Sequence, residues 1–115
     1  MRIRRLFDFE AAHALPRHPG KCRDLHGHSY RFAVVVRGKV NPDTGLAIDF
    51  DDLETVVRRE VISALDHKNL NDTLENPTAE HIAVWIWDRL TGSLQGLEEI
   101  ELFETRDCSV VYRGD

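Results

Sequence analysis

A thiol and two imidazoles fall within seven residues of this chain, in the stretch Cys22-Arg-Asp-Leu-His26-Gly-His28. Side chains two positions apart point to the same side of an extended strand, so this spacing places His26 and His28 on one face. A third imidazole, His13, lies upstream at the end of an alternating segment. Three imidazole nitrogens from neighbouring strands match a zinc site that keeps one position open for water or substrate, whereas magnesium and calcium prefer oxygen ligands. The ligand types are also compatible with nickel or iron.

The role of Cys22 is open between three interpretations. As a fourth ligand it would close the metal site and make it structural, although the spacing Cys-x3-His-Gly-His differs from Cys-x2-Cys ribbons and fingers. As a buried apolar residue it would only pack. A thiolate beside a metal ion or an imidazolium group can act as a base or a nucleophile, which is the third interpretation.

Two carboxylates and a fourth histidine are the next candidates. Asp66-His67 is an adjacent pair in which the carboxylate can orient the imidazole of a proton shuttle; the alternative is a histidine that merely lies at a helix C-terminus. Glu104 shares one face of an expected strand with Ile100 and Leu102. An inward carboxylate among apolar neighbours is usually paired or functional, whereas an outward one is an ordinary strand residue. The remaining candidates are interpreted as structural, with the cysteine in the core: His18, His81 and Cys108.

The composition of the whole chain narrows the class of protein. A length of 115 residues favours one domain over residues 1–115 with a modest core. The net charge of −5, with histidines neutral, argues against a general nucleic-acid role, which needs a basic footprint. No apolar run approaches the ~20 residues that span a bilayer, and the N-terminus does not resemble a signal peptide. We therefore expect a cytoplasmic protein, in which the two cysteines do not form a structural disulfide.

The elements that must position these residues follow the order ββααββ. Alternating apolar residues predict a strand over residues 2–13, and β-branched residues predict an antiparallel partner over 26–40. Two helices follow, one from a cap at Asp51 or Asp52 to about residue 66, and one from a cap at Thr78 to Gly92, with a loop between them. Strands are predicted over 97–105 and 108–112. This order predicts an α+β fold, with a four-stranded antiparallel sheet and both helices on one face. So open a sheet favours oligomerisation.

Six short motifs run through the chain in order. They are Phe9-x-Ala-Ala-His13, Cys22-x3-His26-Gly-His28-Ser-Tyr30, Gly45-x3-Asp49-Phe50, Asp66-His67-x2-Leu70-Asn71, Pro77-Thr-x-Glu80 and Glu104-Thr105. Together they resemble the 6-pyruvoyl-tetrahydropterin synthase family, over residues 9 to about 112. The Cys-x3-His-Gly-His block with Asp-His downstream is the most specific part. The short length is most similar to the bacterial 6-carboxy-tetrahydropterin synthase branch of that family.

The resemblance implies the T-fold, which assembles through its sheets into trimers and often into hexamers with active sites at subunit interfaces. It implies Zn²⁺ on His13, His26 and His28. It also implies that Cys22 is the general base, with Asp66 and His67 as its proton relay. Glu104 matches the glutamate that anchors the pterin ring, where a carboxylate can accept two hydrogen bonds from an amidine-like N–H pair. Two further residues are assigned to substrate binding on the same grounds: Thr105 and Glu80.

The substrate implied by the resemblance is 7,8-dihydroneopterin triphosphate. Zinc would polarise the hydroxyl and carbonyl oxygens of its side chain, and the thiolate would abstract a carbon-bound proton. Triphosphate leaves, and in the carboxy branch the side chain is cleaved with release of acetaldehyde, a step toward queuosine and related 7-deazapurines. Our candidates for contact with the triphosphate are the basic residues of one loop: Arg17, Lys21 and Arg23.

Two alternatives stay open. One is formation of 6-pyruvoyl-tetrahydropterin from the same substrate, and the other is a non-catalytic zinc-binding T-fold protein. The chain departs from the family pattern at Glu10, where a small polar residue is commoner, and at His81, where asparagine is commoner. The presence of Cys22 argues against assigning this chain to those family members that have glutamate in place of the thiol.

Overall fold

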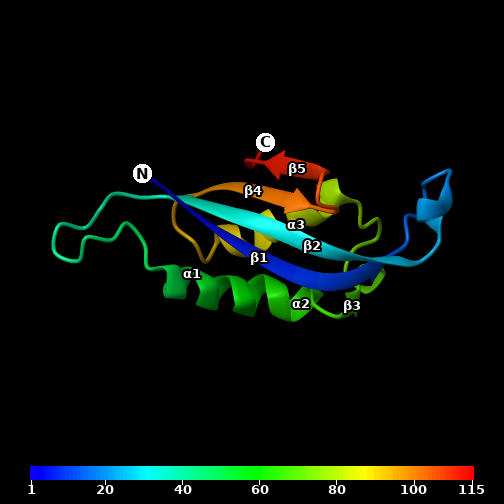
Figure 1. The fold of residues 1–115 in the computed structure, drawn as a ribbon, viewed down its shortest axis with the longest axis horizontal. Helices are drawn as coiled ribbons and strands as arrows, with labels where there is room; N and C mark the ends of the chain where they lie inside the picture. The colour runs from blue at the N-terminus through cyan, green and yellow to red at the C-terminus, as the bar shows by residue number, and fades with distance from the viewer.

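The computed structural model describes residues 1–115 as a twisted sheet with helices packed against one face (Figure 1). Its five strands lie in the order β3-β1-β2-β4-β5. Four are antiparallel neighbours, as predicted: β1 (Arg2–His13), β2 (His26–Arg37), β4 (Leu97–Phe103) and β5 (Ser109–Tyr112). The fifth, β3 (Lys68–Asn69), pairs parallel with β1 inside the stretch expected to be a loop. Two polar residues carry no alternation in the sequence, so their pairing could not be predicted from the pattern.

The cap of the first helix is Asp49, two residues before Asp51 and three before Asp52, the two predicted caps. The Asp49 side chain accepts a 2.7 Å hydrogen bond from the backbone N–H of Asp51, and α1 (Phe50–Val57) follows. Asp51 and Asp52 instead occupy the first turn, where their charges favour the positive end of the helix dipole. The helix continues through a π-helical segment, Arg58–Ile62, into α2 (Ser63–Leu65).

The second predicted helix is confirmed as α3 (Ala79–Thr91), followed by Gly92. The Thr78 hydroxyl caps it by accepting a hydrogen bond from the backbone N–H of His81 at 3.1 Å. Its buried residues recur at helical spacing and face the sheet: Ile82, Ala83, Ile86 and Leu90.

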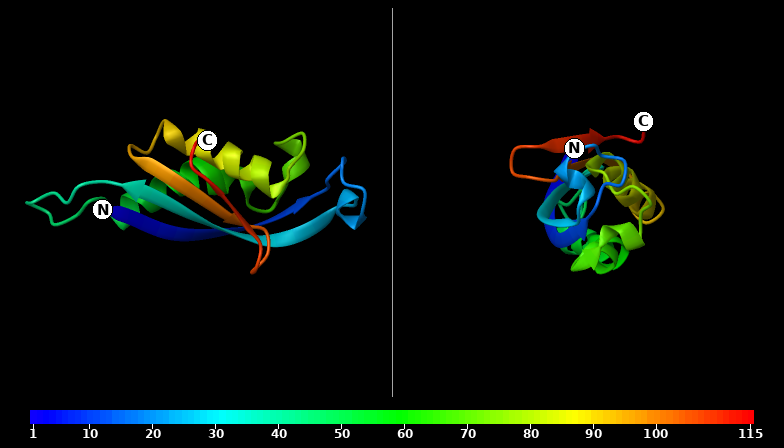
Figure 2. Two further views of the ribbon diagram at one scale, coloured as in Figure 1. Left: turned by 90° about the horizontal axis from the view of Figure 1, so that it is seen from above. Right: turned by 90° about the vertical axis from the view of Figure 1, so that its right-hand side faces the viewer.

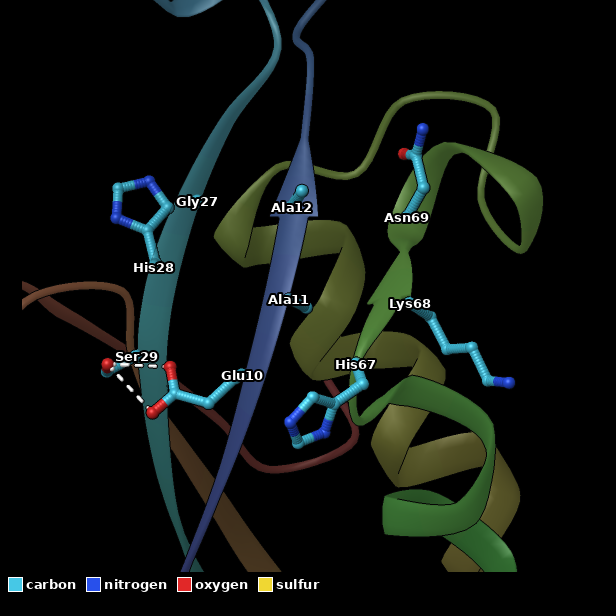
Figure 3. A pocket seen from close by; sticks show the side chains of 9 residues that line it. All are labelled: Glu10, Ala11, Ala12, Gly27, His28, Ser29, His67, Lys68 and Asn69. Atoms are coloured by element: carbon cyan, nitrogen blue, oxygen red, sulfur yellow. Dashed lines mark hydrogen bonds between the residues drawn. The ribbon is translucent and has the colours of Figure 1, made fainter.

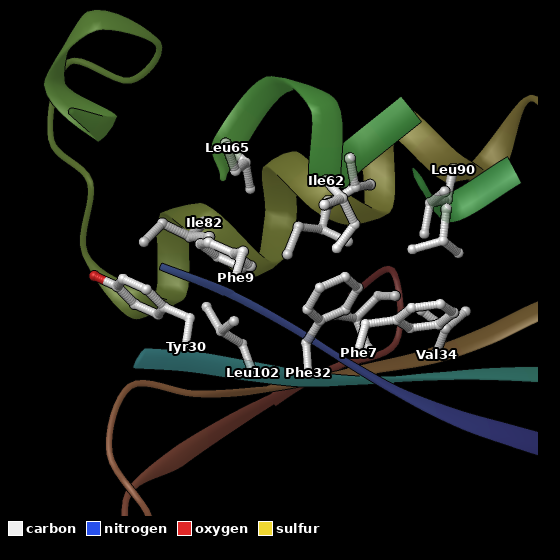
Figure 4. Packing of buried hydrophobic residues seen from close by; sticks show 14 of the residues in the cluster. Phe7, Phe9, Tyr30, Phe32, Val34, Ile62, Leu65, Ile82, Leu90 and Leu102 are labelled. Atoms are coloured by element: carbon white, nitrogen blue, oxygen red, sulfur yellow. The ribbon is translucent and has the colours of Figure 1, made fainter. Parts of the chain in front are cut away.

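The core lies between the helices and one face of the sheet (Figure 4). The register of β1 and β2 places aromatic residues directly opposite one another on that face. Phe9 stacks on Tyr30 with ring centroids 4.9 Å apart, and Phe7 stacks on Phe32 at 5.4 Å. In Figure 4 the Tyr30 hydroxyl points out of one end of this apolar cluster. The residues that continue these faces of β1 and β2 past Phe9 and Tyr30 therefore lie just beyond the end of the core.

The molecule is elongated, with extents of 54 × 24 × 24 Å. Figure 2 shows both helices on the same side of the sheet, which leaves the other side without a covering layer. A loop over residues 38–49 extends from one end, and a loop over residues 14–25 extends from the other (Figure 1). No helix is both long enough and apolar enough to cross a lipid bilayer.

Candidate active site

Three histidines converge at the end of the β1–β2 pair, on the face that carries the core. The strand register places His13 opposite His26 and Ala11 opposite His28, so the two histidines of β2 flank the imidazole of β1. One ligand nitrogen from each ring lies within 4.8 Å of the others. His13 is fully buried, and the other two are half-buried. The three residues could hold a metal ion, in the arrangement that their spacing predicts.

Backbone carbonyl groups determine which nitrogen of two rings carries the proton. His13 Nδ1 lies 2.7 Å from the Pro77 carbonyl oxygen, and His26 Nδ1 lies 2.7 Å from the Asp24 carbonyl oxygen. Because a carbonyl oxygen only accepts, each Nδ1 must donate, and a neutral ring then leaves Nε2 as an acceptor. A hydrogen bond from the ring nitrogen that does not bind the metal orients a metal-binding imidazole.

The ring nitrogens that face each other in this site are suited to bind a cation. Nε2 of His13 lies 3.0 Å from Nε2 of His26, although both are acceptors when the rings are neutral. The buried Nε2 of His28 has no hydrogen-bond partner. Burial lowers the pKa of His28, an effect partly opposed by the negative charge of Glu104, so the neutral form that binds metal is favoured. A positive ion among the three nitrogens would satisfy all of them.

Glu104 lies next to this histidine group. Its carboxylate approaches to 3.8 Å from His28 Nε2, and its side chain is 27% exposed. The residue follows β4, where Leu102 is fully buried on the core face, and its backbone N–H donates to the Cys108 carbonyl oxygen at 3.1 Å. Of the two orientations considered for Glu104, the structure has the carboxylate directed toward the histidines.

Cys22 faces an open cavity of about 400 Å³ that Glu104 also lines. The thiol is half-buried and does not belong to the group that could hold the metal ion. Thr78 and Glu80, from the start of α3, line the same cavity. Because Cys22 borders this open space, the interpretation of Cys22 as a residue that only packs in the core is excluded. The Cys22 thiol and the Glu104 carboxylate can both contact one ligand in this cavity.

Cys108 was expected in the core, and this prediction is wrong. The residue is exposed and lines the cavity that contains Cys22. It precedes β5, which lies at the edge of the sheet, so flanking strand residues do not imply burial there.

Asp66 and His67 lie on a different surface, beside the outer edge of β1. The Glu10 backbone N–H donates to Asp66 Oδ1 at 2.9 Å, and the His67 N–H donates to the Glu10 carbonyl oxygen at 2.6 Å. Asp66 Oδ1 also lies 3.0 Å from His67 Nδ1. The Glu10 N–H, with a smaller contribution from His67, lowers the pKa of Asp66. The carboxylate therefore remains ionised and orients an imidazole that is 79% exposed.

His67 borders a second open cavity, of about 540 Å³, together with Glu10, Ser29, His28 and Lys68 (Figure 3). Ser29 Oγ donates to the Glu10 carboxylate, at 2.6 Å from Oε2 and 2.9 Å from Oε1. His67 and Cys22 thus line separate cavities of one chain.

Thr105 is also separate from the Cys22 cavity. It borders a smaller cavity, of about 260 Å³, together with Arg31 and Arg106. Among the residues predicted to bind substrate, the chain therefore groups Glu104 with Glu80 but not with Thr105.

Several contacts of the site were missed in the sequence. The contacts of Pro77 and Asp24 are made by backbone carbonyl groups, which every residue has, so the pattern of side chains could not predict them. Tyr30 had a signal, because it continues the alternation His26-x-His28-x-Tyr30 and so lies on the histidine face. Its hydroxyl lies 3.1 Å from His13 Nδ1.

Comparisons with known proteins agree with this geometry. The model of the family described as 6-pyruvoyl tetrahydropterin synthase matches residues 2–115. The 6-carboxy-5,6,7,8-tetrahydropterin synthase of Synechocystis is 44% identical over 113 residues, covering 92% of this chain and 88% of that protein. The 6-pyruvoyl tetrahydrobiopterin synthase of Dictyostelium discoideum is 39% identical over 102 residues, covering 84% and 76%. The solved structure of Caenorhabditis elegans 6-pyruvoyl tetrahydropterin synthase has a TM-score of 0.91 at 27% identity, covering 100% of this chain and 96% of that one.

Fold, histidine group and sequence therefore define the same class. The chain belongs to the 6-pyruvoyl tetrahydropterin synthase family, as its motifs indicated. This membership, together with the synthase relatives, makes it a lyase-type enzyme with the family's T-fold.

Proposed function

We propose that this chain is a zinc-dependent 6-carboxy-5,6,7,8-tetrahydropterin synthase. The proposed reaction converts 7,8-dihydroneopterin triphosphate and one molecule of water to 6-carboxytetrahydropterin, triphosphate and acetaldehyde, within queuosine and 7-deazapurine biosynthesis. The observation that carries the proposal is the convergence of three histidines beside a cavity that offers both Cys22 and Glu104. The Synechocystis relative with 44% identity carries the name of this activity.

In this proposal Zn²⁺ is held by His13, His26 and His28. The bound ion would supply a Lewis acid that polarises oxygen atoms of the substrate side chain. The tautomers of His13 and His26 support the assignment, because donation from Nδ1 leaves the Nε2 lone pair of each ring free to bind the ion.

Cys22 and Glu104 divide the remaining work in the cavity between them. Glu104 accepts two hydrogen bonds from the N–H groups of the pterin ring, which orients the ring. Cys22, as thiolate, removes a proton from the substrate side chain. Glu80 contributes a further substrate contact from this cavity, and Thr105 contributes one from the separate cavity that it borders. The basic residues of the loop that carries Cys22 contact the triphosphate: Arg17, Lys21 and Arg23.

Asp66 and His67 complete this site from a second copy of the chain, in a homohexamer built as a dimer of trimers. Two observations support this step. Within one chain, His67 and Cys22 line different cavities. One face of the sheet lacks a covering layer, and most of the outer edge of β1 is open, since β3 pairs only with Ala11 and Ala12.

Incubation of the zinc-loaded protein with 7,8-dihydroneopterin triphosphate tests the proposal. We expect 6-carboxytetrahydropterin, triphosphate and acetaldehyde in equal amounts, and loss of all three with Cys22→Ala. The matched control is Cys108→Ala, which removes a thiol that has no assigned role.

A product without acetaldehyde would favour the second candidate, 6-pyruvoyl-tetrahydropterin formation, whose name the Dictyostelium relative carries. No turnover by the folded protein with full zinc occupancy would instead indicate a non-catalytic zinc-binding member of the family.

A further inference from the structure

The Asn71 side chain makes an unusual pair of contacts outside the residues assigned above. Its Oδ1 accepts a hydrogen bond from the backbone N–H of Ala14 at 2.8 Å, and its Nδ2 donates to the Ala14 carbonyl oxygen at 2.8 Å. One amide side chain thus satisfies both backbone groups of a single residue, as a neighbouring strand would. These contacts join segments 57 positions apart in the sequence.

Ala14 is the point at which the sheet passes into the loop that carries Cys22. The preceding residue, His13, ends β1 and belongs to the histidine group. The following residue, Leu15, donates its backbone N–H to the Cys22 carbonyl oxygen at 2.8 Å. A displacement of Ala14 would therefore move the thiol loop relative to the histidines.

Asn71 is itself held by a well-anchored segment. Its backbone N–H donates to Asn69 Oδ1 at 3.1 Å, and its neighbour Leu70 is fully buried. The adjacent strand β3 pairs with β1. The loop over residues 14–25, in contrast, extends beyond the body of the molecule (Figure 1). The segment that carries Asn71 is thus the better anchored of the two, and Asn71 restrains the loop over residues 14–25.

We propose that Asn71 is a positioning residue that fixes the distance between the Cys22 thiol and the three histidines. The inference rests on the proposed role of Cys22 as base. Asparagine suits this task because it offers one acceptor and one donor at the same reach. Aspartate would keep the acceptor but place a carboxylate oxygen against the Ala14 carbonyl oxygen, and alanine would leave both backbone groups without their partner.

The kinetic test compares Asn71→Ala and Asn71→Asp with the wild-type protein. A displacement of about 1 Å can cost up to about 100-fold in rate, so we expect kcat to fall by about 10-fold to 100-fold in Asn71→Ala and by less in Asn71→Asp. KM should rise by a smaller factor than kcat falls, because Glu104 follows β4, outside this loop, and still binds the ring, while the proposed triphosphate contacts of the loop shift with Cys22. A purely structural role would lower the folded fraction and not separate kcat from KM.

The matched control is Asn41→Ala, in the loop at the opposite end of the molecule. Asn41 Oδ1 accepts from the backbone N–H groups of Asp43 at 2.8 Å and of Thr44 at 3.3 Å, so this variant also removes two side-chain hydrogen bonds from a loop. We expect kcat to stay within about 2-fold of the wild-type value, since no displacement reaches the thiol.

A second readout does not depend on turnover. The rate of alkylation of Cys22 by iodoacetamide, resolved by peptide mass spectrometry, should increase in Asn71→Ala, whereas the rate at Cys108 should not change. Unchanged kcat and unchanged Cys22 alkylation in Asn71→Ala would overturn the inference. If the wild-type protein itself makes no product, the proposed function fails, and the alkylation rates alone decide whether Asn71 fixes the loop.

Discussion

Two of the six histidines, His13 and His67, lie in environments that differ in almost every physical respect. His13 is fully buried, its Nδ1 is held by the Pro77 carbonyl, and its Nε2 faces two other imidazoles. His67 is 79% exposed, and its only side-chain partner is the carboxylate next to it. Its backbone φ of 59° lies in the left-handed region, which few residues other than glycine adopt.

This difference separates two kinds of function. A metal site needs several ligands with fixed orientation, and the register of two paired strands provides that within one chain. A proton relay needs one correctly oriented group that can meet a substrate or another subunit. Two hydrogen bonds to the backbone of Glu10 hold the Asp66–His67 segment in place while the His67 ring remains accessible. The three histidines thus come together within one chain, whereas His67 stays accessible at its surface.

The largest effect is expected from His26→Ala, which breaks the buried site. Removal of one of three nitrogen ligands should reduce the zinc content of the purified protein to near zero. Activity should fall by more than about 1000-fold, because a Lewis acid contributes several kcal/mol to such a reaction. Metal analysis gives the first measurement, and His81→Ala is the matched control. Full zinc occupancy in His26→Ala would contradict the three-histidine site.

The separation of Cys22 from His67 predicts that two inactive variants restore activity when combined. Cys22→Ala and His67→Ala should each lose about 100-fold to 10,000-fold in kcat. If each site takes the thiol from one chain and the imidazole from another, random mixing gives one half times one half, or about one quarter, of sites with both groups.

The mixing experiment requires that the subunits exchange, which mass spectrometry of a labelled copy can verify. Recovery to about one quarter of wild-type activity supports shared sites. No recovery despite verified exchange would mean that both groups act within one chain, and the proposed assembly would be wrong.

A smaller effect is expected from Tyr30→Phe, which leaves all three ligands in place. The buried hydroxyl lies 3.1 Å from His13 Nδ1, so its loss weakens the control of ring orientation. Groups of this kind change metal affinity by about 10-fold to 100-fold, and we expect the lower end because the Pro77 carbonyl remains. Competition with a chelator of known affinity measures the change.

Tyr112→Phe is the control for this substitution, because it removes a phenolic hydroxyl from the edge strand, where the ring packs against Trp87. Equal zinc affinity in Tyr30→Phe and wild-type protein would show that the hydroxyl does not orient His13.

The buried region could be predicted from the sequence to a much greater extent than the exposed one. Alternation along β2 is local, and it placed His26 and His28 on one face without knowledge of the tertiary structure. His13 was added from the predicted partner strand, and the strand register places it opposite His26. The helix periods were likewise sufficient to place α3 and its Thr78 cap. Features set by a few side-chain contacts were not predictable in this way.

Two of the differences depend on tertiary structure. The pairing of β3 needs β1 beside it, and the exposure of Cys108 follows from the position of β5 at the sheet edge. The cap at Asp49 is instead a local contact with Asp51, and three aspartates within four residues made the choice of cap ambiguous. The separation of Cys22 from His67 within one chain also has no sequence signal, because residue order says nothing about which copy completes a site.

The smallest effect is expected from Asp66→Asn, which tests how the exposed pair is held. The pKa of Asp66 is lowered in the folded protein, chiefly by the Glu10 N–H and also by His67, so the charged form stabilises the fold. This contribution is fully present above the unfolded-state pKa of about 4 and is lost as the pH falls through the lower folded-state pKa. The melting temperature of Asp66→Asn should therefore lie slightly below that of the wild-type protein at pH 7. The difference should shrink in acid, while Asp88→Asn on the exposed side of α3 should show no comparable change. A difference that stays constant from pH 7 to below pH 4 would mean that the shape of Asp66, and not its charge, holds His67 against β1.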